Sequence, residues 1–194
     1  MVIQPRFLIP DTNCFIDHLA KIESLIECGF YEVVIPLVVI NELNGLTSRA
    51  VGSSAPTLPF SALLSDALSS DCDHHKRVAH AARKALDYLE TAFLQKNARL
   101  KAITSKGSIL DNINFTNESM QSNDVTNDDV VLSCCLQFIK ERPAERNLHE
   151  SGEIINIFRE TVLLTEDRNL RVKALSQHVP VKSLPVFLQW ANIP

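Results

Sequence analysis

The chain has 194 residues, of which 45% are hydrophobic and 22% are charged, and its formal net charge is −4 at pH 7. This length and composition predict a globular protein with one folded domain and its own hydrophobic core. The negative charge argues against coating of nucleic acid by bulk electrostatics, although it allows a local basic strip. No apolar run approaches the roughly 20 residues of a membrane-spanning helix, and the N-terminus lacks a signal-peptide pattern.

The five cysteines predict reduced thiols in an intracellular protein. Their number is odd, no Cys-x-x-Cys motif occurs, and three of them lie inside apolar helical patterns. Cys72 begins the run Cys-Asp-His-His, but this run lacks zinc-ligand spacing, so a polar loop is the favoured interpretation. We expect the protein in the cytoplasm, with the nucleus as a further location.

Short apolar or β-branched runs alternate with helical patterns along the chain. In order, the pattern predicts a strand over 6–10, a helix over 13–28, a strand over 33–36, helices over 37–45 and 76–95, a strand over 99–104, a helix over 128–140, a strand over 161–165, a helix over 167–175, a strand over 179–181 and a helix over 185–191. This alternation predicts an α/β fold, a three-layer sandwich in which helices cover both faces of a central parallel sheet.

Glycines and polar stretches separate these elements. Gly29 and Gly45 follow apolar helical patterns and predict helix ends. Residues 47–75 are rich in Ser, Pro, Gly and Asp, which predicts a flexible insertion inside a single domain that spans residues 1–194. Further polar loops are predicted over 105–125 and 141–153.

Two aspartates, Asp11 and Asp167, each come shortly after a strongly apolar strand. One such aspartate is often only the N-cap of the next helix. Because parallel strands end at the same edge of a sheet, two of them are better explained by a shared site in the crevice at that edge.

The run Thr126-Asn127-Asp128-Asp129 begins a predicted helix and offers two adjacent candidate acids. Thr126 and Asp129 are three residues apart and can form a pair that resembles a capping box. Asp128 shares a helical face with apolar residues three, four, seven and eight positions later, which predicts that it points toward the sheet. We therefore assign Asp128 to the candidate site and Asp129 to a structural role.

Glu42 is a further candidate, but a lone glutamate on a helix usually faces solvent, so its spacing alone does not select it. Carboxylates that gather at one sheet edge repel each other and require either a cation or raised pKa values. Oxygen ligands without His or Cys favour Mg²⁺ or Mn²⁺ over zinc. Phosphoryl chemistry is the usual work of such a site.

Four motifs resemble those of PIN domain nucleases in order and placement. They are Leu-Ile-Pro-Asp-Thr-Asn at 8–13, Ile-Asn-Glu-Leu at 40–43, Asn-Asp-Asp at 127–129 and Leu-Thr-Glu-Asp-Arg-Asn-Leu at 164–170. The longer words at 11–19, 132–136 and 165–175 are similar, more narrowly, to the C-terminal PIN domain of the endonuclease of nonsense-mediated mRNA decay, in the telomerase-binding EST1-like family. The resemblance covers essentially the whole chain.

The resemblance implies a Rossmann-like sandwich that cuts single-stranded RNA internally with Mg²⁺ or Mn²⁺ and leaves a 5′-phosphate and a 3′-hydroxyl. The acids that match the family's catalytic and metal-binding positions are Asp11, Asp128, Asp167 and Glu42. Asn13 and Thr165 match smaller polar positions that orient the acids or contact water. The segment 47–75 is the part least similar to the family.

Arg168, Arg171 and Lys173 follow Asp167 and are candidate contacts for RNA phosphates, with a purely structural role as the open alternative. Because only 6% of the residues are aromatic, we expect weak base specificity, with other mRNA decay factors choosing the target. An inactive PIN domain that serves as a protein-interaction module is the alternative function, and the presence of all four acids favours the nuclease. A phosphoaspartyl enzyme is disfavoured, since Asn13 stands where that class requires a second aspartate.

Overall fold

A six-stranded sheet forms the middle layer of the computed structural model, which describes residues 2–49, 65–110, 126–141 and 158–193. The spatial order is β4-β3-β2-β1-β5-β6, and neighbouring strands are parallel except that β4 runs antiparallel to β3. The strands are β1 (Val2–Pro10), β2 (Glu32–Pro36), β3 (Leu100–Ile103), β4 (Ile109–Leu110), β5 (Phe158–Leu164) and β6 (Val181–Lys182).

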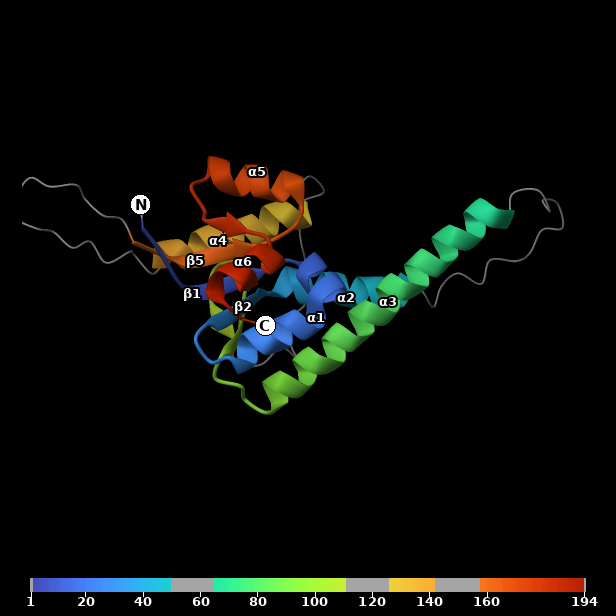
Figure 1. Ribbon diagram of the computed structural model, residues 1–194, viewed down its shortest axis with the longest axis horizontal. Helices are drawn as coiled ribbons and strands as arrows, with labels where there is room; N and C mark the ends of the chain where they lie inside the picture. Colours follow the sequence, from blue (N-terminus) through green and yellow to red (C-terminus); the bar gives the residue numbers. More distant parts are fainter. Residues whose placement is uncertain (1, 50–64, 111–125, 142–157, 194) are drawn as a thin grey trace, which may run out of the picture.

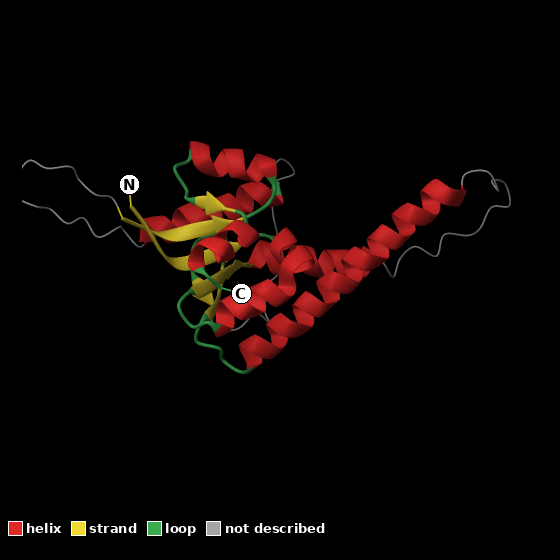
Figure 2. Cartoon of the chain, viewed as in Figure 1, coloured by secondary structure: helices red, strands yellow, loops and turns green. Residues whose placement is uncertain are grey.

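Helices cover both faces of this sheet, so the predicted α/β sandwich is confirmed (Figures 1 and 2). The helices are α1 (Thr12–Glu27), α2 (Leu37–Arg49), α3 (Ser65–Leu94), α4 (Asn127–Glu141), α5 (Arg168–Ser176) and α6 (Leu184–Ala191). Helix α4 packs with α5 on one side of the sheet, whereas α1 packs with α3 and α6 on the other, and α2 contacts both α3 and α4. None of the helices in the described ranges is long and apolar enough to span a membrane.

Packing on both faces fixes where the helices begin. Helix α1 buries Phe15 and Ile22 completely, and α4 buries Phe138, whose ring lies 5.1 Å from that of Phe7 in β1. Full burial of such a side chain contributes about 1.5–3 kcal/mol. Both helices are therefore anchored on the sheet, and α1 begins at Thr12, directly after the N-cap Asp11 that follows β1.

The predicted flexible insertion over 47–75 is wrong at both of its ends. Helix α2 does not stop at Gly45 but continues to Arg49, and α3 already begins at Ser65. A glycine inside a helix costs roughly 1 kcal/mol relative to alanine, and packing of the helix against the core through Leu43 and Leu46 offsets this cost. Residues 50–64 lie outside the described ranges.

The early start of α3 has a simple physical reason. Residues 73–77 are exposed, and this half of the helix extends beyond the sheet (Figure 1). A helical segment that covers no core needs no apolar stripe, so the pattern that predicts amphipathic helices is missing there. A surface ion pair between Asp73 and Lys76, at 3.8 Å, lies in this segment.

Other predicted elements agree with the structure to within a few residues, apart from one short strand. The two-residue strand β4 lies inside the predicted polar loop at 105–125, of which residues 111–125 are outside the described ranges. Most of the predicted loop at 141–153 is also outside them.

The cysteines whose side chains are described are thiols that form no disulfide bond, as predicted. Cys14, Cys134 and Cys135 are buried, and Cys28 is partly buried. Burial raises the pKa of Cys14 and of Cys135, so these thiols stay protonated at neutral pH. The side chain of Cys72 lies outside the described part.

Glu32 is a buried carboxylate near the amino ends of the strands, and basic side chains hold it. Lys101 of β3 donates to Oε2, and Arg6 of β1 donates to Oε1 at 3.3 Å. Burial opposes ionisation of Glu32, but the hydrogen bonds and charges of Lys101 and Arg6 outweigh it and lower the pKa of Glu32.

Candidate functional site

The strand order reverses between β1 and β5, and two candidate acids lie at this point. Strand β2 pairs with one side of β1, and β5 pairs in parallel with the other. Pro10 pairs with Leu164, the last residue of each strand, and the Asp11 N–H donates to the Leu164 carbonyl at 3.0 Å. Asp11 and Asp167 thus follow adjacent strands at the edge where ligand sites form in open α/β sheets.

Asp11 is buried at this edge, with 5% of its surface exposed, and it is the N-cap of α1. Its Oδ1 accepts a hydrogen bond from the Cys14 N–H at 3.0 Å, and its Oδ2 accepts one from the Thr165 hydroxyl. Burial raises the pKa of Asp11, the two hydrogen bonds offset part of this shift, and the charge of Asp167 adds to it. The donors described for Asp11 are neutral, so they leave its buried charge uncompensated.

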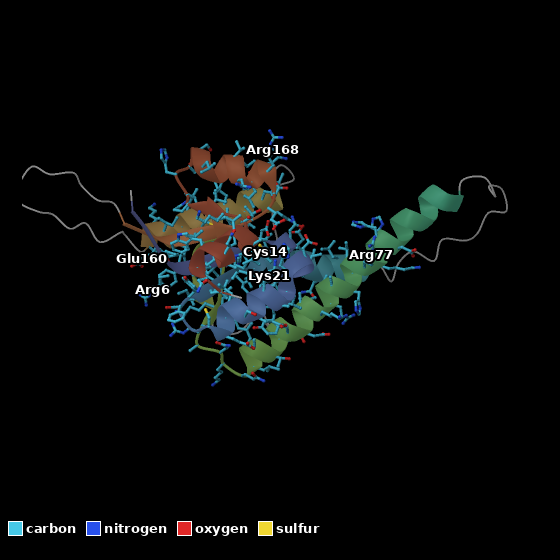
Figure 3. All side chains as sticks on the ribbon, in the orientation of Figure 1. Arg6, Cys14, Lys21, Arg77, Glu160 and Arg168 are labelled. Carbon is cyan, nitrogen blue, oxygen red and sulfur yellow. The ribbon has the colours of Figure 1, made fainter. Side chains whose placement is uncertain are left out.

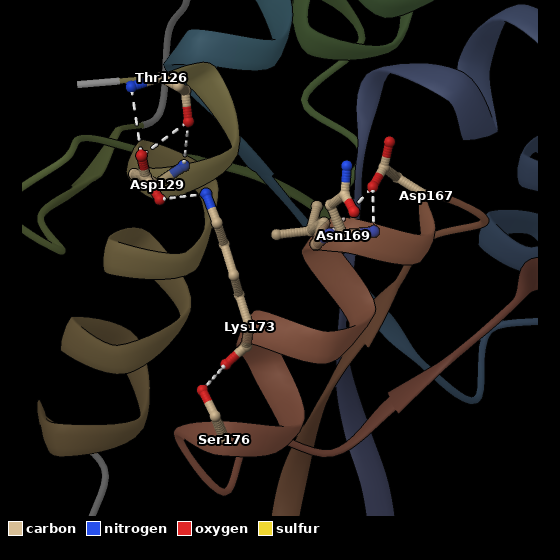
Figure 4. Close-up of polar contacts among 7 residues, drawn as sticks. Thr126, Asp129, Asp167, Asn169, Lys173 and Ser176 are labelled. Carbon is tan, nitrogen blue, oxygen red and sulfur yellow. Dashed lines mark hydrogen bonds and ion pairs between the residues drawn. The ribbon is translucent and has the colours of Figure 1, made fainter. Parts of the chain in front are cut away.

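Asp167 is the N-cap of α5. Its Oδ1 accepts hydrogen bonds from the backbone N–H groups of Asn169 at 2.6 Å and Leu170 at 2.9 Å (Figure 4). The Asp167 N–H donates to the hydroxyl oxygen of the fully buried Thr165 at 3.0 Å. Since that hydroxyl donates to Asp11, Thr165 connects the two acids.

Asp129 forms the predicted pair with Thr126 at the start of α4. Asp129 Oδ2 accepts from the Thr126 hydroxyl at 2.7 Å and from the Thr126 N–H at 3.3 Å, and the Asp129 N–H donates back to Thr126 Oγ1 at 3.3 Å. Asp128 is half-buried. Burial raises its pKa, and the charge of Asp167 raises it further.

Charged side chains from three other elements, α1, α2 and α5, act on Asp128. The negative charges of Glu42 and Asp11 also raise its pKa, whereas the positive charge of Lys173 lowers it. Asp128 is therefore close enough to the other three acids to sense their charges, although burial is the larger effect.

Glu42 lies on α2 and reaches this group through a threonine. The Thr12 hydroxyl, in the first turn of α1, donates to Glu42 Oε2 at 2.6 Å. Thr12 is adjacent to Asp11, so this hydrogen bond attaches the partly buried Glu42 to the same sheet edge. Sequence spacing could not show this, because the contact joins residues 30 positions apart.

Sequence reasoning missed three side chains at this edge. Besides Thr12, Cys14 donates its thiol hydrogen to the Leu164 carbonyl at 3.3 Å. His18 lies at a kink in α1, with φ −139° and ψ 32°, and its Nε2 is 3.0 Å from Glu166 Oε1. The local signals, a polar residue after Asp11 and a histidine inside a helix, are too common in proteins to indicate a site.

The candidate basic residues differ in their surroundings. Arg168 and Arg171 are exposed on α5, and Figure 3 shows the Arg168 side chain at the outer surface near the start of that helix. Lys173 instead donates to Asp129 Oδ1 at 2.6 Å. Asn13 is exposed in the first turn of α1. The RNA-binding role of the three basic residues and the supporting role of Asn13 stay predictions.

The donor set fits a hard divalent cation in its chemistry. All four candidate side chains supply carboxylate oxygens, the ligands that Mg²⁺ and Mn²⁺ prefer, and two of them have raised pKa values that a bound cation would relieve. In the arrangement described, however, no three His, Cys, Asp or Glu side chains of the described ranges form a group that could hold a metal ion.

A separate apolar groove lies at the β6 edge of the sheet. Its volume is about 550 Å³, and Leu175, Phe187 and Trp190 are among its lining residues. None of the four candidate acids lines it. The groove therefore contributes nothing to the acidic site.

Fold and site together define a class: an α/β domain with carboxylates gathered at the switch point of a mostly parallel sheet. The chain belongs to the PIN domain family, because the family model described as PIN domain matches residues 8–185. The family predicted from the four motifs is thus confirmed.

The chain is also similar to individual proteins of known sequence or structure. The chain is 41% identical to telomerase-binding protein EST1A of Danio rerio, over 98% of this chain and 12% of that protein. It is 27% identical to transcriptional protein swt1 of Schizosaccharomyces pombe, over 94% of this chain and 30% of that protein. It therefore spans less than a third of either relative. A solved structure of the PIN domain of human SMG5 shares 16% identity, with a TM-score of 0.49, and the match covers 95% of this chain and 98% of that one.

Proposed function

We propose that this PIN domain is a metal-dependent endoribonuclease that hydrolyses single-stranded RNA, acting in nonsense-mediated mRNA decay. One observation carries the proposal: Asp11 and Asp167 follow the adjacent parallel strands β1 and β5 and are joined through Thr165, and a hydrogen bond from Thr12 attaches Glu42 to the same edge of the sheet. Asp128 begins α4, and its pKa, raised first by burial and further by the charges of the other three acids, supports the same placement. Crowded carboxylates of this kind are costly for a fold unless a cation joins them.

The four acids would hold one or two Mg²⁺ or Mn²⁺ ions. When bound, such a cation polarises the phosphodiester and lowers the pKa of water. Thr165 holds Asp11 in place through its hydroxyl, and Thr12 does the same for Glu42. The expected products carry a 5′-phosphate and a 3′-hydroxyl.

Substrate binding would rest on the phosphate backbone. Arg168 and Arg171 are exposed on the helix that Asp167 caps, so they are placed to contact phosphates beside the acids. Such contacts carry no sequence information, and we propose that other mRNA decay factors select the RNA. The proposed location is the cytoplasm, with the nucleus as a further site. The similarity to a telomerase-binding protein supports a role inside larger assemblies.

One observation favours a second candidate, a PIN domain that serves as a protein-interaction module. The described acids do not form a ready-made metal group. A module without catalysis would have no need of a closed metal site. The nuclease remains the better-supported function, because a module would also have no need of four carboxylates at one sheet edge.

Cleavage of a circular single-stranded RNA in the presence of Mn²⁺ tests the proposal. Only an internal cut can open a circle, and a 5′-phosphate on the product distinguishes this hydrolysis from that of contaminating metal-independent ribonucleases. Asp11→Asn keeps the size of the side chain but removes its charge. Since loss of a group that only orients a metal ligand costs about 10–100-fold, we expect this variant to lose more than roughly 100-fold.

The matched control is Asp87→Asn, which removes an exposed aspartate of α3 and should cleave at the wild-type rate. EDTA should stop cleavage by both proteins. An intact circle with wild-type protein, or equal cleavage by wild type and Asp11→Asn, would reject the nuclease and leave the interaction module as the better explanation.

A further inference from the structure

An ion pair joins two helices whose first turns carry candidate acids. Asp128 lies in the first turn of α4, and Asp167 caps α5. Between these helices, Lys173 Nζ of α5 donates to Asp129 Oδ1 of α4 at 2.6 Å (Figure 4). The adjacent acid Asp129 thus contacts α5, and the charges of Asp167, Glu42 and Asp11 act on Asp128.

Each partner of this ion pair makes a further hydrogen bond near its own helix, Asp129 through its side chain and Lys173 through its backbone carbonyl. Asp129 uses its other oxygen, Oδ2, to accept from Thr126 and so caps α4. Lys173 lies in the middle of α5, where its carbonyl accepts from the Ser176 hydroxyl at 2.7 Å. Helices α4 and α5 also pack in contact, so the ion pair lies across an existing helix–helix contact.

We propose that the Asp129–Lys173 ion pair is a clamp that holds the start of α4 against α5 and thereby sets the position of Asp128 relative to Asp167. The clamp matters for catalysis only through the proposed function, on which this inference rests. Lys173 is then a positioning residue and not a phosphate contact, which leaves Arg168 and Arg171 as the candidates for RNA.

The exposure of the two side chains agrees with a geometric role. Each is 41% exposed, and ion pairs at such sites usually contribute little to stability. The Lys173 charge also acts on Asp128, whose pKa it lowers against the effects of burial and of Asp167. A cation tied down beside the acids therefore limits their repulsion before metal binds.

Three variants of the full chain separate the clamp from a simple charge effect: Lys173→Met, Asp129→Asn and the double variant. Asparagine keeps a side-chain oxygen for Thr126, so α4 stays capped. The readout is the Kd for Mn²⁺, measured by calorimetry. A clamp predicts that each single variant weakens Mn²⁺ binding by about 10-fold, the scale of lost outer-shell partners, and that the double variant binds no more weakly than the weaker single one.

Through-space electrostatics predicts a different pattern. Removing the positive charge of Lys173 should strengthen Mn²⁺ binding, and removing the negative charge of Asp129 should weaken it. The double variant, whose net charge is unchanged, should bind like wild type. Opposite signs in the two single variants would overturn the clamp.

Kinetics on single-stranded RNA separate the clamp from a phosphate contact. The clamp predicts a lower kcat with an unchanged KM in Lys173→Met, and recovery of most activity in Lys173→Arg. Arg171→Gln, on the same helix, should raise KM without changing the Kd for Mn²⁺. A raised KM and a weaker salt dependence in Lys173→Met, with Asp129→Asn unaffected, would show that Lys173 contacts RNA and overturn the clamp.

Hydrogen exchange in the absence of metal tests the clamp independently of whether the proposed function is correct. Lys173→Met leaves Thr126 and Asp129 in place on α4, yet it should accelerate amide exchange in the first turn of that helix. Unchanged exchange there would overturn the clamp. If wild-type protein neither binds Mn²⁺ nor cleaves RNA, the proposed function fails, and accelerated exchange would still establish the clamp as a tie between the two helices.

Discussion

Glu32 and Asp11 are both buried carboxylates of the same sheet, one near the amino ends of its strands and the other just after the carboxyl end of β1. Glu32 is held by Lys101 and Arg6, and its pKa is lowered. Asp11 is held by a hydroxyl and a backbone N–H, faces the charge of Asp167, and has a raised pKa. The chain thus supplies cations for one acid and neutral donors for the other.

This difference separates a structural acid from a candidate functional one. Burial acts against ionisation at both positions. At Glu32 the chain's own cations overcome it, so no external ligand is needed. At Asp11 the chain provides only neutral donors, so a bound metal cation could balance the negative charge of this carboxylate. The predictions below test this contrast.

The largest expected effect on stability is at the amino ends of the strands. Lys101→Met should lower the free energy of unfolding by about 1–3 kcal/mol, below the cost of breaking a fully buried pair because Arg6 remains. The melting temperature would fall by roughly 2–4 °C per kcal/mol in a domain of this size. Urea unfolding checks this value. The control is Lys106→Met at an exposed position, and an equal loss in both variants would contradict the structural role of Lys101.

The opposite sign is expected at the carboxyl ends. Without metal, Asp11→Asn removes a buried charge that lacks a cation but keeps an acceptor for the Cys14 N–H. We expect the free energy of unfolding to rise by about 1 kcal/mol, the scale of gains when functional strain is removed. Thermal unfolding in EDTA measures it. A clear drop in melting temperature would show that Asp11 stabilises the metal-free fold, as Glu32 does.

A smaller effect should appear in the pH dependence of stability. Because the pKa of Asp11 is raised in the folded state, the folded protein holds a proton that the unfolded chain releases above about pH 4. Its contribution to stability is therefore present at low pH and is lost as pH rises through the folded pKa. Glu32, with a lowered pKa, acts in the other direction and below about pH 4.5.

We therefore expect the melting temperature of the metal-free protein to fall less steeply in Asp11→Asn than in wild type as the pH rises above about 4, since the pKa of Asp11 is raised in the folded state. The difference between the two curves removes the contribution of other titrating groups. Parallel curves over this range would mean that Asp11 ionises as readily in the folded protein as in the unfolded chain.

Sequence reasoning succeeded where a side chain's role follows from its neighbours along the chain. Asp11 directly follows β1, and Asp167 comes shortly after β5. Because parallel strands end at one edge of a sheet, the proximity of these two acids could be inferred. Asp129 could be separated from Asp128 because a cap and an inward-facing position differ by one residue. These inferences required only the regular spacing of side chains along strands and helices.

Contacts between distant segments could not be found in this way. The hydrogen bond from Thr12 to Glu42 and the ion pair of Lys173 with Asp129 depend on how α1, α2, α4 and α5 pack. The start of α3 was missed because the exposed residues 73–77 carry no apolar stripe. In each case the deciding interaction lies in tertiary packing or solvent exposure, on which local sequence gives no information.

Stabilisation by Mn²⁺ tests most directly whether the acidic edge is built for an external cation. Wild type, Asp11→Asn and Glu32→Gln are each unfolded thermally with and without Mn²⁺. A ligand at 100 times its Kd stabilises the fold by about 2.7 kcal/mol. We predict a shift of that order for wild type and for Glu32→Gln, despite the lower starting stability of the latter, and no shift for Asp11→Asn. No shift in wild type, or equal shifts in all three proteins, would contradict the contrast between the two ends of the sheet.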